Sequence, residues 1–170
     1  MRHRWAPWGL VLLACVGYGY ATEPPASESL KTLEKRADRG DRAAEYALGK
    51  MYVEGRGVRL DEGEAAREYR KAAEQAYASA LHELAQAYAT GRGVPADDVE
   101  AYLWMDLAAF RARGALREQC SAERDALART MSPEQVAQAE RRGVEWKRNG
   151  LRSQTVCVPL QTPADAGAHA

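Results

Sequence analysis

The sequence predicts an all-helical protein built from stacked repeats. Three observations support this: an internal repeat of 36 residues, the helical spacing of apolar residues in each copy, and abundant alanine. Aligning residues 42–77 with residues 78–113 gives 13 identities in 36 positions. A fixed period of this length is typical of arrays in which each repeat stacks on the next. Alanine, the strongest helix former, occurs 33 times, against a single phenylalanine.

The first half of each repeat predicts a helix that ends in a glycine turn. In the first copy, Ala44, Leu48 and Tyr52 are four residues apart, so a helix places them on one face. Two glycines follow, and glycine enters left-handed backbone conformations without a steric penalty. The second copy has the same pattern. We expect the recurring residues to be structural: Leu48, Tyr52, Gly55 and Gly57, with Leu84, Tyr88, Gly91 and Gly93.

The second half of each repeat predicts a capped helix. Asp61 can cap its N-terminus, and Glu64 lies three residues further on, in the register of a capping box. The same spacing recurs at Asp97 and Glu100. The recurring alanines of this half are small enough to let two antiparallel helices approach closely. We therefore expect each repeat to be a pair of antiparallel helices.

Residues 1–21 are expected to form an export signal. A positively charged start is followed by a nearly continuous apolar run, and Gly19 and Ala21 offer the small residues that signal peptidase requires. A transmembrane anchor would need about 20 apolar residues, more than this segment has. Lipidation of Cys15 remains open, because Leu12-Leu13-Ala14-Cys15 resembles a bacterial lipobox. Either route predicts an exported protein, periplasmic or secreted, or alternatively a membrane-anchored lipoprotein, with no transmembrane helix in the mature chain.

The rest of the chain is expected to flank and close the array. Leu33 lies one period before Tyr69, which indicates an incomplete repeat at the start. Ser132 and Pro133 form a helix-start signal, and Gly150 is expected to end that helix. The expected division is a signal at 1–21, a linker at 22–28, a half repeat at 29–40, full repeats at 41–76 and 77–112, a C-terminal helical cap at 113–149, and a mostly disordered tail at 150–170.

Two cysteines, Cys120 and Cys157, remain once Cys15 is removed or lipidated. In an oxidising compartment an even number of cysteines favours a disulfide, so we predict that these two are bridged. The bridge would close a loop of 37 residues, for which chain entropy gives about 4 kcal/mol as an upper figure. The alternative is a nucleophile with a spare thiol.

Two short motifs resemble catalytic signatures in their letters alone. The stretch from His82 to Gln86 lacks the second histidine that the zinc motif H-E-x-x-H requires. Residues 91–96 match the dinucleotide pattern G-x-G-x-x-A, but a helix precedes them where that fold needs a strand. The formal net charge is zero, which gives no electrostatic footprint for nucleic acid. We therefore predict no catalytic residues, metal, cofactor or nucleic-acid partner.

The combined pattern resembles the Sel-one-like repeat family, relatives of the tetratricopeptide repeats. The resemblance covers about residues 29–112. It implies a right-handed α-solenoid of antiparallel helix pairs. In the second repeat Ala85 replaces the helix glycine of the family pattern. After the second helix of the two full repeats, Ala76 and Ala112 replace the family's usual glycine. The first repeat carries the pattern at Ala44, Leu48, Gly49, Tyr52, Gly55, Gly57, Val58, Asp61, Ala65, Tyr69, Arg70, Lys71, Ala72, Ala73, Glu74 and Gln75.

The resemblance also implies a function. Members of the family act as adaptors that hold a partner protein or peptide in a concave groove, lined by the first helix of each pair. We therefore expect an exported, non-enzymatic scaffold; the alternative is an envelope hydrolase, or a protein that binds peptidoglycan or an antibiotic in the same groove. The implied groove residues are Tyr46, Lys50, Val53 and Glu54, with His82, Gln86, Ala89 and Thr90 one period later.

Overall fold

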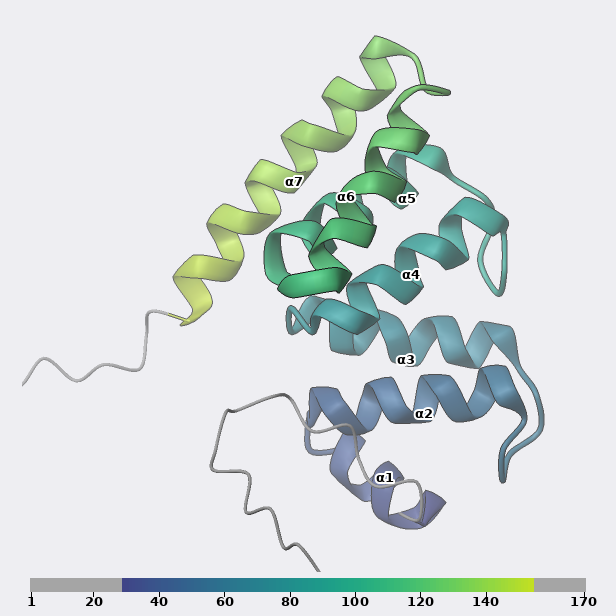
Figure 1. Cartoon of the computed structure of the whole chain (residues 1–170). Helices are drawn as coiled ribbons and strands as arrows, with labels where there is room; N and C mark the ends of the chain where they lie inside the picture. Colours follow the sequence, from purple (N-terminus) through teal and green to yellow (C-terminus); the bar gives the residue numbers. More distant parts are fainter. Residues whose placement is uncertain (1–28, 155–170) are drawn as a thin grey trace, which may run out of the picture.

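The computed structural model describes residues 29–154, and all regular elements in that range are helices (Figure 1). The predicted all-α solenoid is confirmed. The expected export signal, linker and most of the C-terminal tail lie outside the described residues. The helices are α1 (Leu30–Ala37), α2 (Arg42–Glu54), α3 (Glu62–Glu74), α4 (Ala78–Thr90), α5 (Asp98–Arg111), α6 (Gly114–Ala128) and α7 (Pro133–Gln154).

The helices stack in consecutive pairs. Helices α2 and α3 form the first full repeat and α4 and α5 the second, while α1 packs on α2 as the second helix of an incomplete repeat. The main core runs through the interface of the two repeats and up to α6 and α7, and a smaller core fixes α1 to α2. Within residues 29–154 no helix is both long and apolar enough to cross a bilayer.

The glycine turns have the same geometry in both repeats. Gly55 and Gly91 end α2 and α4 with φ of 63° and 74°, in the left-handed region. The next residue of each turn donates its N–H back across the helix end, from Arg56 to Met51 and from Arg92 to Ala87, both at 3.0 Å. This bond is typical of a helix that stops in a left-handed residue. The predicted helix stops are confirmed.

The aspartate caps are also confirmed, but the expected capping boxes are only half formed. Asp61 accepts from the N–H of Glu64 at 2.9 Å, and Asp97 accepts from that of Glu100 at 3.1 Å. The backbone N–H of each aspartate, which the glutamate was expected to bind, donates instead to the carbonyl of a motif tyrosine in the preceding helix. Each glutamate instead accepts a hydrogen bond from another side chain: Glu64 from an arginine one turn further along the helix, and Glu100 from Trp104.

The second glycine of each turn has a different environment in the two repeats. A Cβ at Gly93 would lie 2.0 Å from the carbonyl oxygen of Glu62 and 2.8 Å from the backbone nitrogen of Gly63. Among residues 29–154, a Cβ at Gly57 would meet only the end of the Met51 side chain, at 3.4 Å. The position equivalent to Glu62 one period earlier is residue 26, outside the described range. Gly93 is therefore an inter-repeat contact, and Gly57 a turn residue.

Replacement of the two glycines by alanine should separate these roles. Gly93→Ala combines backbone strain with a clash against immobile backbone, and should lower the free energy of unfolding by about 3 kcal/mol. Gly57→Ala adds a strained φ alone, at about 1 kcal/mol. Urea unfolding followed by circular dichroism measures both. Equal losses would show that the approach of Gly93 to α3 is not as close as described.

The three turns that follow the second helix of each pair differ in their residue type or in their backbone conformation. Gly40 has a φ of 79°, and its equivalent Ala76 keeps a left-handed φ of 60° although it carries a Cβ. Among the described residues, Ala76 is the one non-glycine with a positive φ. Ala112 instead adopts an extended backbone with φ of −69° and ψ of 164°. The third turn therefore differs in conformation from the first two.

Glycine substitutions at the two alanines should have opposite effects. Ala76→Gly relieves left-handed strain of about 1–2 kcal/mol and loses part of that gain to unfolded-state entropy, so it should stabilise the fold by about 0.5–1 kcal/mol. Ala112→Gly relieves no strain and should destabilise it by about the same amount. Thermal unfolding of both variants provides the comparison. A loss of stability in Ala76→Gly would contradict the strain at that turn.

The two helices of the first repeat touch at Gly49 and Tyr69. A Cβ at Gly49 would lie 2.5 Å from two carbons of the Tyr69 ring, so the ring rests directly on the backbone of α2. One period later, Ala85 and Met105 occupy the two equivalent positions, and both are buried. A larger residue on the first helix is thus matched by a slimmer one on the second. The missing helix glycine of the second repeat is compensated within its own pair.

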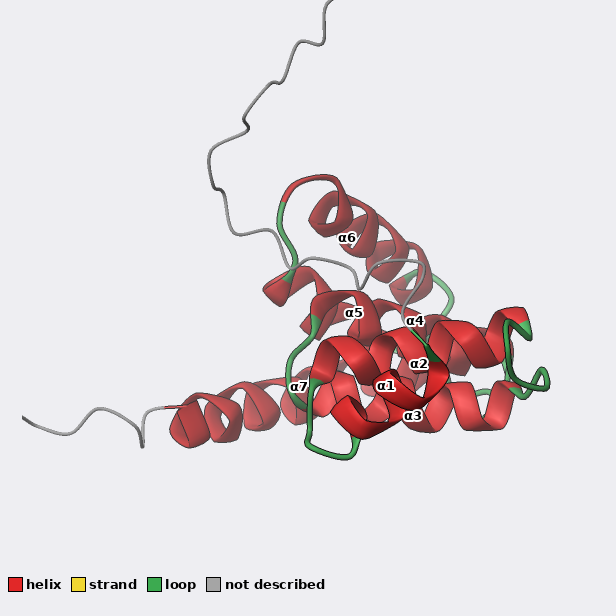
Figure 2. Cartoon of the chain, turned by 90° about the horizontal axis from the view of Figure 1, so that it is seen from below, coloured by secondary structure: helices red, strands yellow, loops and turns green. Residues whose placement is uncertain are grey.

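The predicted cap is a third pair of helices in the register of the array. Helix α6 begins 36 residues after α4, and α7 begins 35 after α5. The two cap helices are splayed, because both pack on α5, one on each side of it (Figure 2). The capping box at the start of α7 is complete, since Ser132 and Gln135 exchange hydrogen bonds of 2.8 and 3.2 Å. Gly150 does not end α7, which continues to Gln154.

Candidate functional site

The predicted groove residues lie on α2 and α4, the first helices of the two full repeats. They differ in how far they reach solvent. Glu54, Ala89 and Thr90 are exposed. Lys50, Val53 and Gln86 are half-buried, and Tyr46 and His82 are buried. Whether any of the eight binds a partner stays a prediction, but the expectation of an accessible surface is wrong for Tyr46 and His82.

Tyr46 is part of the core between the two repeats. It is 6% exposed, and its ring centroid lies 5.7 Å from that of Tyr69 on α3 and 5.2 Å from that of Tyr77 at the start of α4. Lys50 lies one turn along α2, with its Nζ 5.8 Å from the centre of the Tyr46 ring. Tyr46 therefore joins two repeats and supports Lys50. It is not an open aromatic anchor.

His82 is covered by the third helix pair. It is 7% exposed, and its Nε2 lies 3.0 Å from Glu123 Oε2 on α6 and 3.2 Å from the amide nitrogen of Gln86. Burial opposes ionisation of Glu123, but hydrogen bonds from Gln119 and His82 outweigh it and lower the pKa of that carboxyl. The bond between His82 and Glu123 ties α6 to α4. The repeat motif did not predict this contact, because Glu123 lies beyond the recognisable repeats.

A small cleft lies next to the exposed members of the predicted groove residues. Val53 from α2 lines it, together with Tyr69 from α3 and Glu83 from α4. Alanines form much of its remaining wall, and its charged residues are Glu62, Glu83 and Arg92. An apolar lining with a net negative rim suits a long side chain with a cationic end.

The structure also shows two buried carboxylates that the sequence analysis missed. Glu45 on α2 and Glu68 on α3 are both buried, at positions that the second repeat fills with Leu81 and Trp104. Gln75 donates to Glu45 at 2.7 Å, and Lys71 forms an ion pair with Glu68 at 2.5 Å. Burial, and then the neighbouring Glu68, raise the pKa of Glu45. Comparison of the two repeats could have found this pair, because acidic residues replace apolar ones.

The raised pKa of Glu45 predicts a pH-dependent effect of its replacement. The folded state holds the Glu45 proton more tightly than the unfolded state, so its contribution to stability falls as pH rises through the folded pKa. Glu45→Gln keeps an acceptor for Gln75 and removes the buried charge. It should raise the free energy of unfolding at pH 7, with a much smaller gain at pH 4. A gain equal at both pH values would contradict the assignment.

Cys120 on α6 is fully buried, and burial raises the pKa of its thiol to about 11, so the thiol is protonated at neutral pH. Its predicted disulfide partner Cys157 and the possible lipidation site Cys15 lie outside the described residues, and both remain predictions. Within residues 29–154, no group of three or more histidine, cysteine or acidic side chains could hold a metal ion.

Comparison with known families agrees with this geometry. A model described as the Sel1 repeat matches residues 42–77 and 78–109, which contain the pairs α2–α3 and α4–α5 except for the last two residues of α5. Residues 42–109 of the chain therefore consist of two consecutive Sel1 repeats. The resemblance stated from the sequence is confirmed. Proteins built from Sel1 repeats are typically interaction scaffolds. No curated protein matches the sequence.

A solved structure supports the helical repeat fold described above. The chain superimposes on the crystal structure of a protective antigen from uropathogenic Escherichia coli strains that displays an SLR fold, with a TM-score of 0.64 and 28% identity. The match covers 82% of this chain and 30% of that one, so this chain spans less than a third of its relative. A Sel1 repeat protein from Oxalobacter formigenes matches with 34% identity and a TM-score of 0.49, over 53% of this chain and 26% of that one.

Proposed function

We propose that this Sel1 repeat protein is an exported scaffold that binds a peptide segment of a partner protein along α2 and α4. The observation that carries the proposal is the contrast between the two repeats. The stacking residues recur, whereas the accessible positions on the first helices change from Lys50 to Gln86 and from Glu54 to Thr90. Side chains that stacking does not require are free to serve recognition.

The cleft beside these positions indicates what kind of segment fits. It lies between both repeats and is lined by Val53, Tyr69, Glu83 and alanines. An extended peptide could place one lysine or arginine there, with its stem against the Tyr69 ring and its charge near Glu83. Within residues 29–154 no observation favours the hydrolase alternative.

The export part of the proposal rests on residues 1–21. Their positive start, apolar run and small residues before position 22 are the features of a secretory signal. The partner is therefore sought in the cell envelope or outside the cell. A fusion of residues 1–28 to a reporter that is active only after export tests this part independently of binding.

A paired-variant capture experiment tests the groove. The full chain, the double variant Lys50→Ala/Gln86→Ala and the control Arg67→Ala/Gln138→Ala are used as bait for envelope proteins. The control likewise removes one cation and one amide, from exposed positions on α3 and α7. The partner's affinity should fall at least tenfold in the groove variant, about 1.4 kcal/mol, and stay unchanged in the control.

Two results would contradict the groove. One is full affinity of the Lys50→Ala/Gln86→Ala variant with unchanged helicity. The other is an equal loss in the control. Tyr46 is not a suitable position for this test, because its replacement would disturb the packing of Tyr69 and Tyr77 and would confuse unfolding with lost binding.

A further inference from the structure

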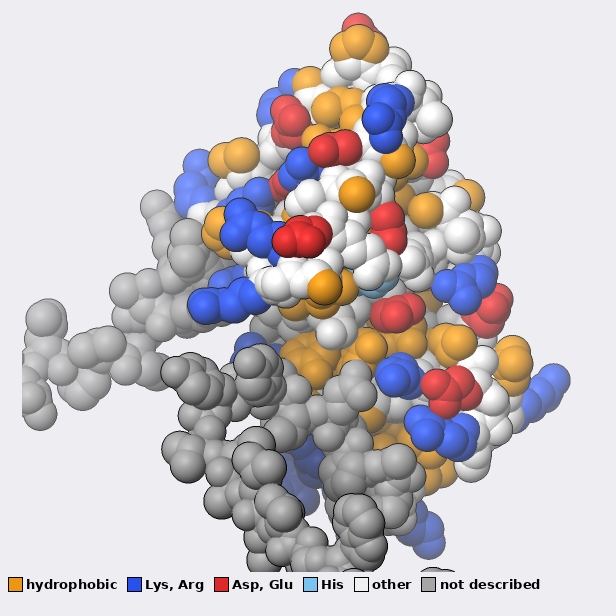
Figure 3. All heavy atoms as spheres, in the orientation of Figure 1, with side chains coloured by type: hydrophobic (Ala, Val, Ile, Leu, Met, Phe, Trp, Pro, Cys, Tyr) orange, Lys and Arg blue, Asp and Glu red, His pale blue; other side chains and the backbone are white. Residues whose placement is uncertain are grey.

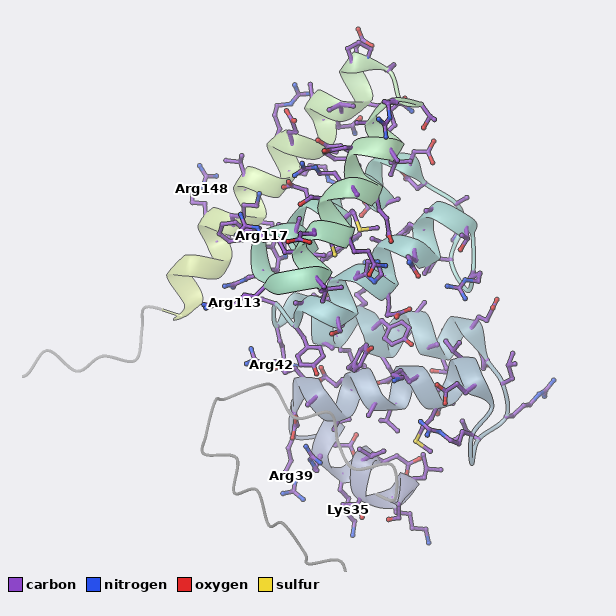
Figure 4. All side chains as sticks on the ribbon, viewed as in Figure 1. Lys35, Arg39, Arg42, Arg113, Arg117 and Arg148 are labelled. Atoms are coloured by element: carbon purple, nitrogen blue, oxygen red, sulfur yellow. The ribbon has the colours of Figure 1, made fainter. Side chains whose placement is uncertain are left out.

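One edge of the array collects positive charge. The turns from α1 to α2, from α3 to α4 and from α5 to α6 lie at this edge, as does the end of α7. Lysine and arginine side chains gather on the part of this edge that the space-filling view shows, at the upper left (Figure 3). We call this surface the basic edge, and Figure 4 labels the six residues that define it: Lys35, Arg39, Arg42, Arg113, Arg117 and Arg148.

From this edge we infer a second interaction surface, separate from the groove of α2 and α4, that binds an acidic polypeptide segment through its carboxylates. The first support is the lack of internal neutralisation. Among residues 29–154, no acidic side chain forms an ion pair with Lys35, Arg39, Arg42, Arg113 or Arg117. Arg148 has one, Glu145, at 4.0 Å.

The second support is that three of these cations oppose helix stability. Arg42 is the first residue of α2, Arg113 is the N-cap of α6, and Arg117 lies in the fourth position of α6. The N-terminus of a helix carries partial positive charge and favours acidic residues or hydroxyl caps. Helix α6 has no acidic residue in its first turn and no side-chain cap. Its exposed amides add to the positive potential of the arginines.

The third support is an unused donor beside the start of α6. Arg111 ends α5, and its Nε is buried and has no hydrogen-bond acceptor. The neighbouring Phe110 ring is 52% exposed, and the Nζ of Lys147 lies 5.0 Å from its centre. A buried donor without an acceptor is costly, and a bound ion or ligand group that supplies the acceptor would remove this cost. The exposed ring offers an apolar contact next to these donors.

The composition of the edge favours carboxylates on a protein. Five of the six labelled residues are arginine, whose planar fork binds a carboxylate through two parallel hydrogen bonds. Apart from Arg148, the cations lie at or beside helix ends along the array, which matches an extended chain with acidic residues at intervals. A membrane-binding surface would need an apolar face, and Phe110 is the one large exposed hydrophobic residue at the ends of α5 and α6.

Fluorescence anisotropy with a defined acidic probe tests the inference. The probe is a labelled 16-residue peptide of alternating glutamate and serine, with a glutamine-serine peptide as the neutral comparison. It is titrated with the full chain, with Arg113→Gln/Arg117→Gln, and with the matched control Arg56→Gln/Arg59→Gln. The control removes the same charge from the exposed turn at the opposite edge.

We expect the acidic peptide to bind and the neutral one not to bind. The edge variant should weaken binding at least tenfold, and the control less than twofold. A third variant, Arg113→Asp, provides a cap for α6, so it should raise the melting temperature by about 3 °C while it abolishes binding. That combination separates a binding role from a structural one.

Three outcomes would overturn the inference. The acidic peptide does not bind the full chain at low salt; or the Arg56→Gln/Arg59→Gln control loses as much affinity as the edge variant; or vesicles with anionic headgroups bind through Arg113 and Arg117 while the peptide does not. The last result would assign the edge to a membrane surface.

Discussion

The close approach of the second glycine turn to the start of α3 sets the spacing of the two repeats. Gly93 touches the backbone of Glu62 and Gly63, which are rigid parts of a helix start. Once this distance is set, α4 packs on α3, and Tyr46, Tyr69 and Tyr77 belong to the core that joins the two repeats. The spacing of the two repeats in turn determines which side chains stay exposed on both sides of the array.

The sequence predicted those parts of the fold that local chemistry determines. The period, the left-handed glycines, the aspartate caps and the Ser132 start signal each depend on a few adjacent residues. Two local expectations were wrong. Glu64 does not complete its capping box, because the Asp61 N–H already binds the Tyr52 carbonyl. Gly150 does not end α7, because glycine tolerates a helix even though it does not favour one.

The candidate site was less predictable, since burial depends on neighbours that are distant in sequence. Tyr46 was expected on an open groove, but the Tyr77 ring, 31 residues later, packs on it. His82 is covered by α6, whose sequence no longer shows the repeat motif. Thr90 is exposed, but its predicted role in the groove stays a prediction. Which partner the exposed groove positions select depends on side-chain chemistry that no helical pattern encodes.

The contact between Gly49 and Tyr69 limits how such an array can grow. In the first pair a tyrosine ring rests on a glycine, whereas in the second pair a methionine and an alanine occupy the equivalent positions. Each second helix is therefore specific for its own first helix. Recombination within a pair would set Tyr69 against Ala85 and create a steric conflict. Lengthening by gene duplication is therefore expected to copy whole pairs, with breakpoints in the turns around residues 40, 76 and 112.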